Sequence, residues 1–305
     1  MGAPRYLVFS GGGLHGLAFC GALLGLIDEG ELDLSRVEGC VGTSIGALLS
    51  LAVCVGLSAE RMRTLILERA DWSRLHTGVN VASVVERYGL ESRAGLEYLV
   101  HLVLADAGLS PTVTLRGAYA LTKRHLCVCV GDLTHARLRY LDHTRAPDLG
   151  VCDAVVASMC VPVLFEPMHI DGIGLCVDGG IVENVPLRFF DAAESVCFCF
   201  ATDDAPAEID NWRDYVAAIL RCAGQAKAES DAPLLQQHAR VCTVRVPPHL
   251  PSSLEIHRVT PQLAQVFLTL GYLQASPRRA RELEEVMGSI LHLVCAVHSC
   301  TQELP

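Results

Sequence analysis

The sequence lacks several features of secreted and nucleic-acid-binding proteins. It has no Asn-x-Ser/Thr glycosylation acceptor, and the stretch 1–5 lacks the apolar core of a secretory signal. Its 24 basic residues are outnumbered by 34 acidic ones, so the formal net charge is −10. Nucleic-acid binding needs a basic face that releases counterions from phosphates, so this balance argues against it. It also argues against broad electrostatic adhesion to an anionic membrane.

Charged residues are also scarce, at 19% of the 305 residues, whereas 51% are hydrophobic. This composition excludes disorder and fits one large core, so we expect a single domain over residues 1–305. The 14 cysteines lie mostly in apolar runs, such as 127–129 and 197–199, where a thiol acts as a small hydrophobic side chain. We therefore expect reduced thiols and an intracellular, cytoplasmic protein. Metal sites favour two-residue gaps at a turn, so we expect no metal.

Short apolar runs alternate with helical patterns along the chain. Strands are expected at 6–9, 37–41, 126–130, 137–141, 175–177, 196–200 and 241–246. Helices are expected at 14–29, 45–57, 58–71, 91–107, 153–159 and 211–230. This alternation predicts an α/β fold, a three-layer α/β/α sandwich with a mostly parallel central sheet.

Two apolar segments allow a second interpretation. The uncharged run 39–59 has the length of a membrane span, but its four glycines favour a strand, a sharp turn and a buried helix. A C-terminal helical segment, about 260–305, carries an apolar stripe. We expect it to pack on the core, and insertion of part of it into a lipid surface is the alternative.

The sequence Gly42-Thr43-Ser44-Ile45-Gly46 falls between an expected strand and an apolar helix. A serine in a Gly-x-Ser-x-Gly turn at such a corner projects its hydroxyl at the edge of the sheet. The start of the following helix favours a developing negative charge. Alone, the pattern is equally typical of an ordinary glycine turn. Its position makes Ser44 a candidate nucleophile.

A second glycine-rich loop, Ser10-Gly11-Gly12-Gly13-Leu14-His15-Gly16, follows the first expected strand. Consecutive glycines let backbone N–H groups converge on an anion. That anion could be a nucleotide phosphate or the oxyanion of a tetrahedral intermediate. A phosphate loop would carry a lysine after the glycines or an acidic residue after the next strand, and neither is present. The oxyanion hole is therefore the better interpretation.

A third loop, Asp178-Gly179-Gly180, follows the expected strand 175–177, with Asn184 and Pro186 shortly after it. An isolated Asp-Gly pair is usually only a turn. Together with the two earlier loops, this one resembles the patatin-like phospholipase family. Ala157-Ser158, Pro162, Phe165 and Pro167 match a further block of that family, and all the blocks occur in the family's order within about residues 5–200.

The resemblance implies a catalytic dyad in which Ser44 is the nucleophile and Asp178 the general base. It also implies an oxyanion hole of Gly11, Gly12 and Gly13. A histidine base completing a triad is the alternative. However, Ser44 comes after only one earlier strand, which is awkward for an α/β-hydrolase and natural for a patatin-like sheet. The family commonly has Arg or Lys where this sequence has His15, so His15 is a candidate substrate contact with an altered headgroup preference.

The expected activity is therefore hydrolysis of fatty-acyl esters of a phospholipid or an acylglycerol through an acyl-enzyme on Ser44. The same dyad would also serve a transacylase or a thioesterase, and a catalytically silent lipid-binding module is the non-enzymatic alternative. No cofactor is expected. The expected partners are a lipid or acyl-ester substrate and, transiently, a membrane or lipid-droplet surface.

Overall fold

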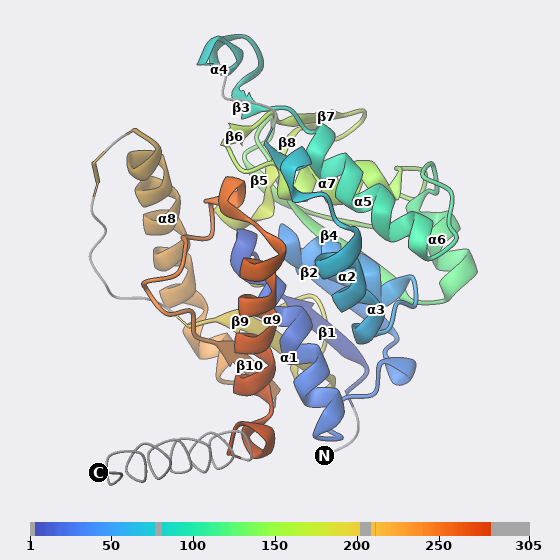
Figure 1. Ribbon diagram of the computed structural model, residues 1–305. Helices are drawn as coiled ribbons and strands as arrows, with labels where there is room; N and C mark the ends of the chain where they lie inside the picture. The colour runs from blue at the N-terminus through green and yellow to red at the C-terminus, as the bar shows by residue number, and fades with distance from the viewer. Residues whose placement is uncertain (1–3, 77–80, 202–208, 211, 239, 282–305) are drawn as a thin grey trace, which may run out of the picture.

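The computed structural model describes residues 4–281, except 77–80, 202–208, 211 and 239 (Figure 1). At its centre lies a sheet with the strand order β10-β9-β1-β2-β4-β8-β7, and β5 pairs with β4 as well. These strands are β1 (Tyr6–Phe9), β2 (Gly39–Thr43), β4 (His125–Asp132), β5 (Arg137–Asp142), β7 (Met168–Ile170), β8 (Gly174–Asp178), β9 (Ser195–Phe200) and β10 (Arg240–Val244). The strands from β10 to β4 are parallel, whereas β5, β7 and β8 are antiparallel to their neighbours.

Helices cover both faces of this sheet, as Figure 1 shows. They are α1 (Leu17–Asp28), α2 (Ile45–Cys54), α3 (Ala59–Thr64), α4 (Val81–Arg87), α5 (Ala94–Asp106), α6 (Leu115–Thr122), α7 (Val151–Met159), α8 (Trp212–Leu235) and α9 (Pro261–Ala275). A small second sheet pairs β3 (Gly89–Glu91) with β6 (Val163–Phe165). The expected α/β fold with a mostly parallel central sheet is confirmed.

The central strands β1, β2, β4 and β9 are buried on both faces because their apolar side chains alternate between two clusters. Leu7 and Phe9 of β1 join the larger cluster, which includes side chains from α1, α2, α5, α7 and α9. Val8 of the same strand points to the opposite face, where Leu234 and Leu235 of α8 cover it. A strand covered on both faces reads as a continuous apolar run, which is the pattern of parallel sheets in α/β proteins.

Cysteines contribute to this core as the sequence predicted. All 12 cysteines in the described residues are free thiols. Cys127, Cys197 and Cys199 lie in the smaller cluster, so the alternating cysteines of β4 and β9 fill one face of the sheet. Burial raises the pKa of the Cys176 thiol to about 11, so this thiol stays protonated and unreactive at neutral pH.

Several elements differ from the expectations. The predicted helix over 58–71 divides into α3 and a wider π-helical turn, Leu65–Arg69. Helices α4 and α6 and the strands β3, β6 and β7 were not predicted, because each is too short for a periodicity to stand out. Helix α9 forms the first part of the C-terminal helical segment expected at about 260–305, but residues 282–305 lie outside the described residues, so the packing of that part and the single domain over 1–305 stay predictions. In the described part, no helix is both long and apolar enough to cross a membrane.

The register of β4 brings two distant strands together. Residues Gly39–Thr43 of β2 pair with the first part of β4, and Thr43 lies opposite Cys129. Asp178 of β8 lies opposite the next residue, Val130. Strand β5 occupies one edge of β4 along Cys127–Asp132. Strands β2 and β8 therefore both pair with the opposite edge of β4, where their carboxyl ends meet. The residues that follow β2 and end β8 are therefore neighbours.

Candidate active site

Ser44 occupies a strained turn between β2 and α2. Its φ of 56° and ψ of −128° are unusual for a residue with a side chain. The two flanking glycines make the turn sterically feasible. A Cβ on Gly42 would lie 2.1 Å from the carbonyl oxygen of Gly46, and one on Gly46 would lie 2.5 Å from that of Ser10. The Gly-x-Ser-x-Gly spacing therefore has a local cause in the close contact of β1, β2 and α2.

Ser158 at the end of α7 holds this turn in place. Its hydroxyl accepts the Ser44 N–H at 2.8 Å and donates to the carbonyl oxygen of Cys129 at 2.6 Å. The Thr43 hydroxyl donates to the carbonyl oxygen of Glu183 at 2.9 Å, which ties the turn to the loop after β8. These buried hydrogen bonds fix the backbone of the turn, and none of them uses the Ser44 hydroxyl.

Asp178 ends β8 beside Ser44 and is fully buried. Its Oδ1 atom accepts the Gly180 N–H at 2.7 Å, and Gly179 begins the short turn that brings this N–H back. Its Oδ2 atom is buried without a hydrogen-bond partner among the described residues. The Ser44 hydroxyl lies close enough to this carboxylate to stabilise its charged form.

Burial raises the pKa of Asp178 to about 6 because a low-dielectric environment penalises the carboxylate. The Ser44 hydroxyl and the Gly180 N–H both work in the opposite direction by stabilising the charged form. A carboxylate with a pKa near 6 is ionised at neutral pH and is a stronger base than an ordinary aspartate. In the described part of the chain, no histidine forms a hydrogen bond with Ser44 or Asp178.

The glycine loop leaves two backbone donors unused. Four of its N–H groups donate to carbonyl oxygens: Ser10 to Phe198 at 2.9 Å, Gly11 to Asn184 at 3.0 Å, Leu14 to Ser253 at 2.9 Å and His15 to Gly12 at 3.0 Å. Within the described residues, the N–H groups of Gly12 and Gly13 donate to no protein acceptor. Gly11 belongs to the loop but its donor is already satisfied, so the two free donors are those of Gly12 and Gly13.

A segment from the C-terminal part of the chain, residues 251–256, lies against this loop. Gly13 has a φ of 47°, and a Cβ there would lie 2.1 Å from the carbonyl oxygen of Ser253. His15 contacts the carbonyl oxygen of Pro251 through Nε2 at 2.8 Å. Sequence analysis gave no signal for this contact, because 251–256 has no regular pattern and lies more than 200 positions from the loop.

His15 has a mainly structural environment. Its ring lies between Phe200 and Phe267, with centroid distances of 5.9 and 5.4 Å. Burial lowers the pKa of His15, so the side chain is neutral at physiological pH. Its neighbours Gly13 and Leu14 line the cavity beside Ser44, whereas His15 does not. The expected substrate contact stays a prediction that this geometry does not favour.

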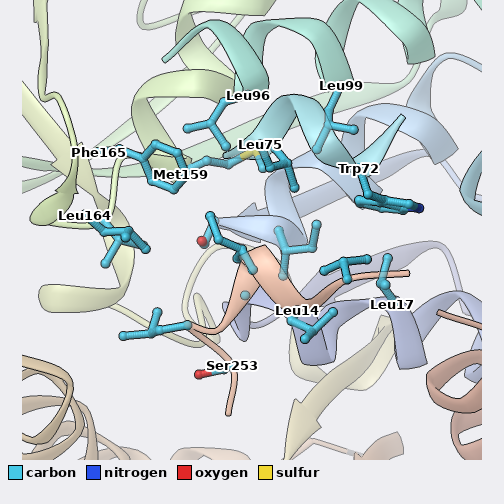
Figure 2. Close-up of a pocket in the computed structure, with 17 residues that line it drawn as sticks. Leu14, Leu17, Trp72, Leu75, Leu96, Leu99, Met159, Leu164, Phe165 and Ser253 are labelled. Carbon is cyan, nitrogen blue, oxygen red and sulfur yellow. The ribbon is translucent and has the colours of Figure 1, made fainter. Parts of the chain in front are cut away.

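An apolar cavity opens beside Ser44 (Figure 2). Its empty volume is about 560 Å³, open mouth included. The lining side chains come from the glycine loop, the start of α1, α2, α5, α7, the stretch 161–165, the turn Trp72–Leu75 and the segment 253–259: Leu14, Leu17, Ile45, Trp72, Leu75, Leu96, Leu99, Met159, Val161, Leu164, Phe165, Ser253, Leu254, Ile256 and Val259. Apart from Ser44 and Ser253 the wall offers hydrocarbon, so it suits an aliphatic group.

One group of side chains has the composition of a metal site. His125, Asp142 and His143 place ligand atoms within 4.8 Å of one another. The carboxylate of Asp142 is already bonded to Thr144 and Arg145, which gives it a role in the turn after β5. His125 begins β4, whereas the residues near Ser44 lie toward the other end of that strand. This group is therefore separate from the site at Ser44.

The family model of the patatin-like phospholipases matches residues 7–191. This range contains the glycine loop, the turn at Ser44 and the loop at Asp178, and it covers more than half of the chain. The chain therefore belongs to the patatin-like phospholipase family.

Two viral proteins are among its relatives. The chain is 24% identical over 227 residues to the uncharacterized protein R571 of Acanthamoeba polyphaga mimivirus, an alignment that covers 70% of this chain and 74% of R571. It is 21% identical over 192 residues to the probable lipid hydrolase 463L of invertebrate iridescent virus 6, covering 60% of this chain and 63% of 463L.

Among solved structures, VipD from Legionella pneumophila has the same fold. The superposition has a TM-score of 0.54 at 17% sequence identity and covers 90% of this chain and 66% of VipD. The chain thus spans less than two thirds of the length of both VipD and 463L. The similarity to VipD concerns the fold alone.

Proposed function

We propose that this protein is a serine lipid acyl hydrolase in which Ser44 is the nucleophile and Asp178 the general base. The observation that carries the proposal is the buried carboxylate of Asp178, which interacts with the Ser44 hydroxyl and whose Oδ2 atom has no other hydrogen-bond partner among the described residues. An unpaired buried carboxylate oxygen is costly for folding, so its retention calls for a role. Accepting the proton of the Ser44 hydroxyl is such a role for the Oδ2 atom of Asp178.

In the acylation step, the Ser44 Oγ attacks the ester carbonyl carbon while its proton passes to Asp178 Oδ2. The new Oγ–C bond gives a tetrahedral intermediate with a negative oxygen. The free N–H groups of Gly12 and Gly13 are the donors for that oxyanion. When the intermediate collapses, the C–O bond to the alcohol breaks and the protonated Asp178 returns the proton to the leaving alcohol.

Deacylation repeats the cycle with water in place of the Ser44 hydroxyl. Asp178 takes a proton from the water as its oxygen attacks the acyl-enzyme carbonyl. Collapse of the second intermediate breaks the C–Oγ bond, and Asp178 returns the proton to Ser44. The products are a free fatty acid and an alcohol, and every proton is accounted for by the dyad.

The cavity beside Ser44 supports a substrate with a fatty-acyl group. A hydrocarbon wall gains from burial of methylene groups and offers nothing to a polar acyl group. We expect a phospholipid or an acylglycerol presented at a membrane or lipid-droplet surface. The family match and the name of the relative 463L agree with this class of substrate.

Labelling with a fluorophosphonate probe tests the proposal directly. We expect the probe to modify Ser44, detected by mass spectrometry of the tryptic peptide, and Ser44→Ala to abolish both labelling and hydrolysis of p-nitrophenyl butyrate. A folded wild-type protein that is neither labelled nor active would instead be a lipid-binding module. Product analysis with an added alcohol separates hydrolysis from acyl transfer.

A further inference from the structure

A second apolar cavity adjoins the one at Ser44. Its empty volume is about 550 Å³, open mouth included. Its lining lies between the start of α1, α2, α3, the turn Leu65–Arg69 and α5, and is made of Gly16, Leu17, Ile45, Leu48, Leu49, Ala52, Met62, Leu65, Ile66, Ala70, Trp72, Leu99, Leu102 and Val103. No lining residue carries a charge. An open cavity lined by uncharged, mostly aliphatic side chains suits an apolar ligand.

The two cavities share part of their walls. Leu17, Ile45, Trp72 and Leu99 line both of them. Figure 2 shows three of these side chains, Leu17, Trp72 and Leu99, gathered at one end of the cavity at Ser44, with Leu164 and Phe165 at the other end. These three side chains therefore form the boundary between the two cavities.

Helices α2 and α5 each present apolar side chains to both cavities. On α5, Leu96 and Leu99 line the first cavity, and Leu99 and Val103 line the second. This spacing of three and four residues places them on one face of the helix. On α2, Ile45 follows Ser44 directly and Leu48, Leu49 and Ala52 continue the same face along the second cavity.

Trp72 forms the junction between the two cavities and is fixed in place. Its indole N–H donates to the carbonyl oxygen of Ile66 at 3.1 Å, so the polar atom of the ring is satisfied within the protein. The apolar part of the ring is then free to contact a ligand. A junction built from an indole and aliphatic side chains suits contact with a polymethylene chain and offers no partner to a polar headgroup.

We propose that the second cavity continues the acyl site, so that a single long acyl chain runs from Ser44 past Trp72 and ends between α2, the turn Leu65–Arg69 and α5. The substrates are then esters of long-chain fatty acids, and the second cavity sets the preference for chain length. This inference rests on the proposed function. Each methylene buried there contributes about fourfold to binding or to kcat/KM.

The test is a chain-length profile of wild type and Ala70→Phe, measured with p-nitrophenyl butyrate, decanoate and palmitate in mixed micelles. Ala70 lines the second cavity and not the first, and its side chain is half-buried, so a phenyl ring there fills the second cavity. We expect kcat/KM for palmitate to fall at least tenfold while that for butyrate stays within twofold. Ala105→Phe, at an exposed position of α5, is the matched control and is expected to leave the profile unchanged.

A second measurement is independent of turnover and of how well Ala70→Phe folds. Wild-type protein is labelled with fluorophosphonates that carry a short or a long alkyl chain, and the thermal midpoint of each adduct is compared. We expect the long-chain adduct to unfold at the higher temperature, because its tail fills the second cavity. Equal midpoints, or an Ala70→Phe profile identical to that of wild type, would overturn the inference.

The failures of the two proposals are distinct. If Ser44 is labelled and butyrate is hydrolysed, but chain length has no effect on either measurement, the dyad stands and the second cavity is not an acyl site. If Ser44 is not labelled and no ester is hydrolysed, the proposed function itself fails, and the inference fails with it.

Discussion

Thr43 and Asp178 lie opposite adjacent residues of one strand, Cys129 and Val130 of β4. The parallel β2 and the antiparallel β8 approach each other along one edge of β4, so the residue after β2 and the residue that ends β8 meet. Backbone hydrogen bonds of the sheet thus determine how Ser44 and Asp178 are positioned. A site built on strand ends is more rigid than one carried on long loops.

The first prediction concerns the pH dependence of activity. Asp178 acts as a base only when it is ionised, and its pKa is raised to about 6. We expect kcat/KM for a soluble ester to be constant above pH 7 and to fall tenfold per pH unit below about pH 6. A profile governed instead by a group titrating near 4 or near 8 would contradict the role given to Asp178.

The second prediction concerns stability and uses the same group. The folded state holds the Asp178 proton more tightly than the unfolded chain, where the pKa is about 3.8. Ionisation therefore destabilises the folded state as the pH rises from about 4 to 6, by roughly 3 kcal/mol in total. Asp178→Asn removes this titration, so its stability relative to wild type should increase over that window. Urea denaturation of both proteins at pH 4 and pH 7 measures the difference, and the variant should be almost inactive.

The third prediction concerns the strained turn. Ser44 has a φ of 56°, which a glycine adopts without the steric penalty of a Cβ. We expect Ser44→Gly to be more stable than Ser44→Ala by about 1 kcal/mol, and both variants to be inactive. Urea denaturation provides the comparison. Equal stability of the two variants would mean that the turn relaxes when the serine is removed.

The fourth prediction tests the hydroxyl that holds the turn. Ser158→Ala leaves the Ser44 N–H and the Cys129 carbonyl oxygen buried without their partner. We expect a loss of about 2 kcal/mol in the free energy of unfolding and a lower kcat.

Ser50 on α2 is the matched control. It is fully buried, and its hydroxyl has no hydrogen-bond partner among the described residues. Ser50→Ala should leave stability unchanged or raise it by up to about 1 kcal/mol. If both variants lose stability equally, the loss comes from packing and the hydrogen bonds of Ser158 have no special role.

The fifth prediction tests the contact between the glycine loop and the segment 251–256. Gly13→Ala places a Cβ against the carbonyl oxygen of Ser253 and would displace a donor of the proposed oxyanion hole. We expect kcat/KM to fall about a hundredfold. Gly30→Ala is the control, because Gly30 also has a positive φ but nothing lies within 4 Å of its Cβ position. It should cost about 1 kcal/mol of stability and no activity.

The sequence was sufficient to predict the elements around Ser44, Asp178 and the glycine loop, because glycines and short apolar strands give strong local signals. The family and the α/β fold followed from the order of these elements, and both are confirmed. The roles of Ser44, Asp178 and the loop glycines stay predictions. The structure adds the strand register that brings Ser44 and Asp178 together. It also shows that the N–H groups of Gly12 and Gly13 have no acceptor among the described residues.

Other parts of the site have no local signal. Ser158 was recognised as part of a motif, but its hydrogen bond to Ser44 joins residues 114 positions apart. The cavity wall contributed by Trp72 and by the segment 253–259 depends on tertiary packing between elements far apart in the sequence. Periodicity describes one element at a time, so it cannot show which elements enclose a space.

The segment 251–256 lies well beyond residue 191, where the family match ends. The matched part contains Ser44, Asp178 and the glycine loop, whereas part of the cavity wall comes from residues 253–259, which lie outside the match. A chain cut near residue 200 would keep the chemical groups and lose one side of the substrate chamber. Under the proposed function, the reacting groups and part of the acyl-site wall thus lie in separate portions of the polypeptide, and exchanging the later portion between relatives is a way to change selectivity while keeping reactivity.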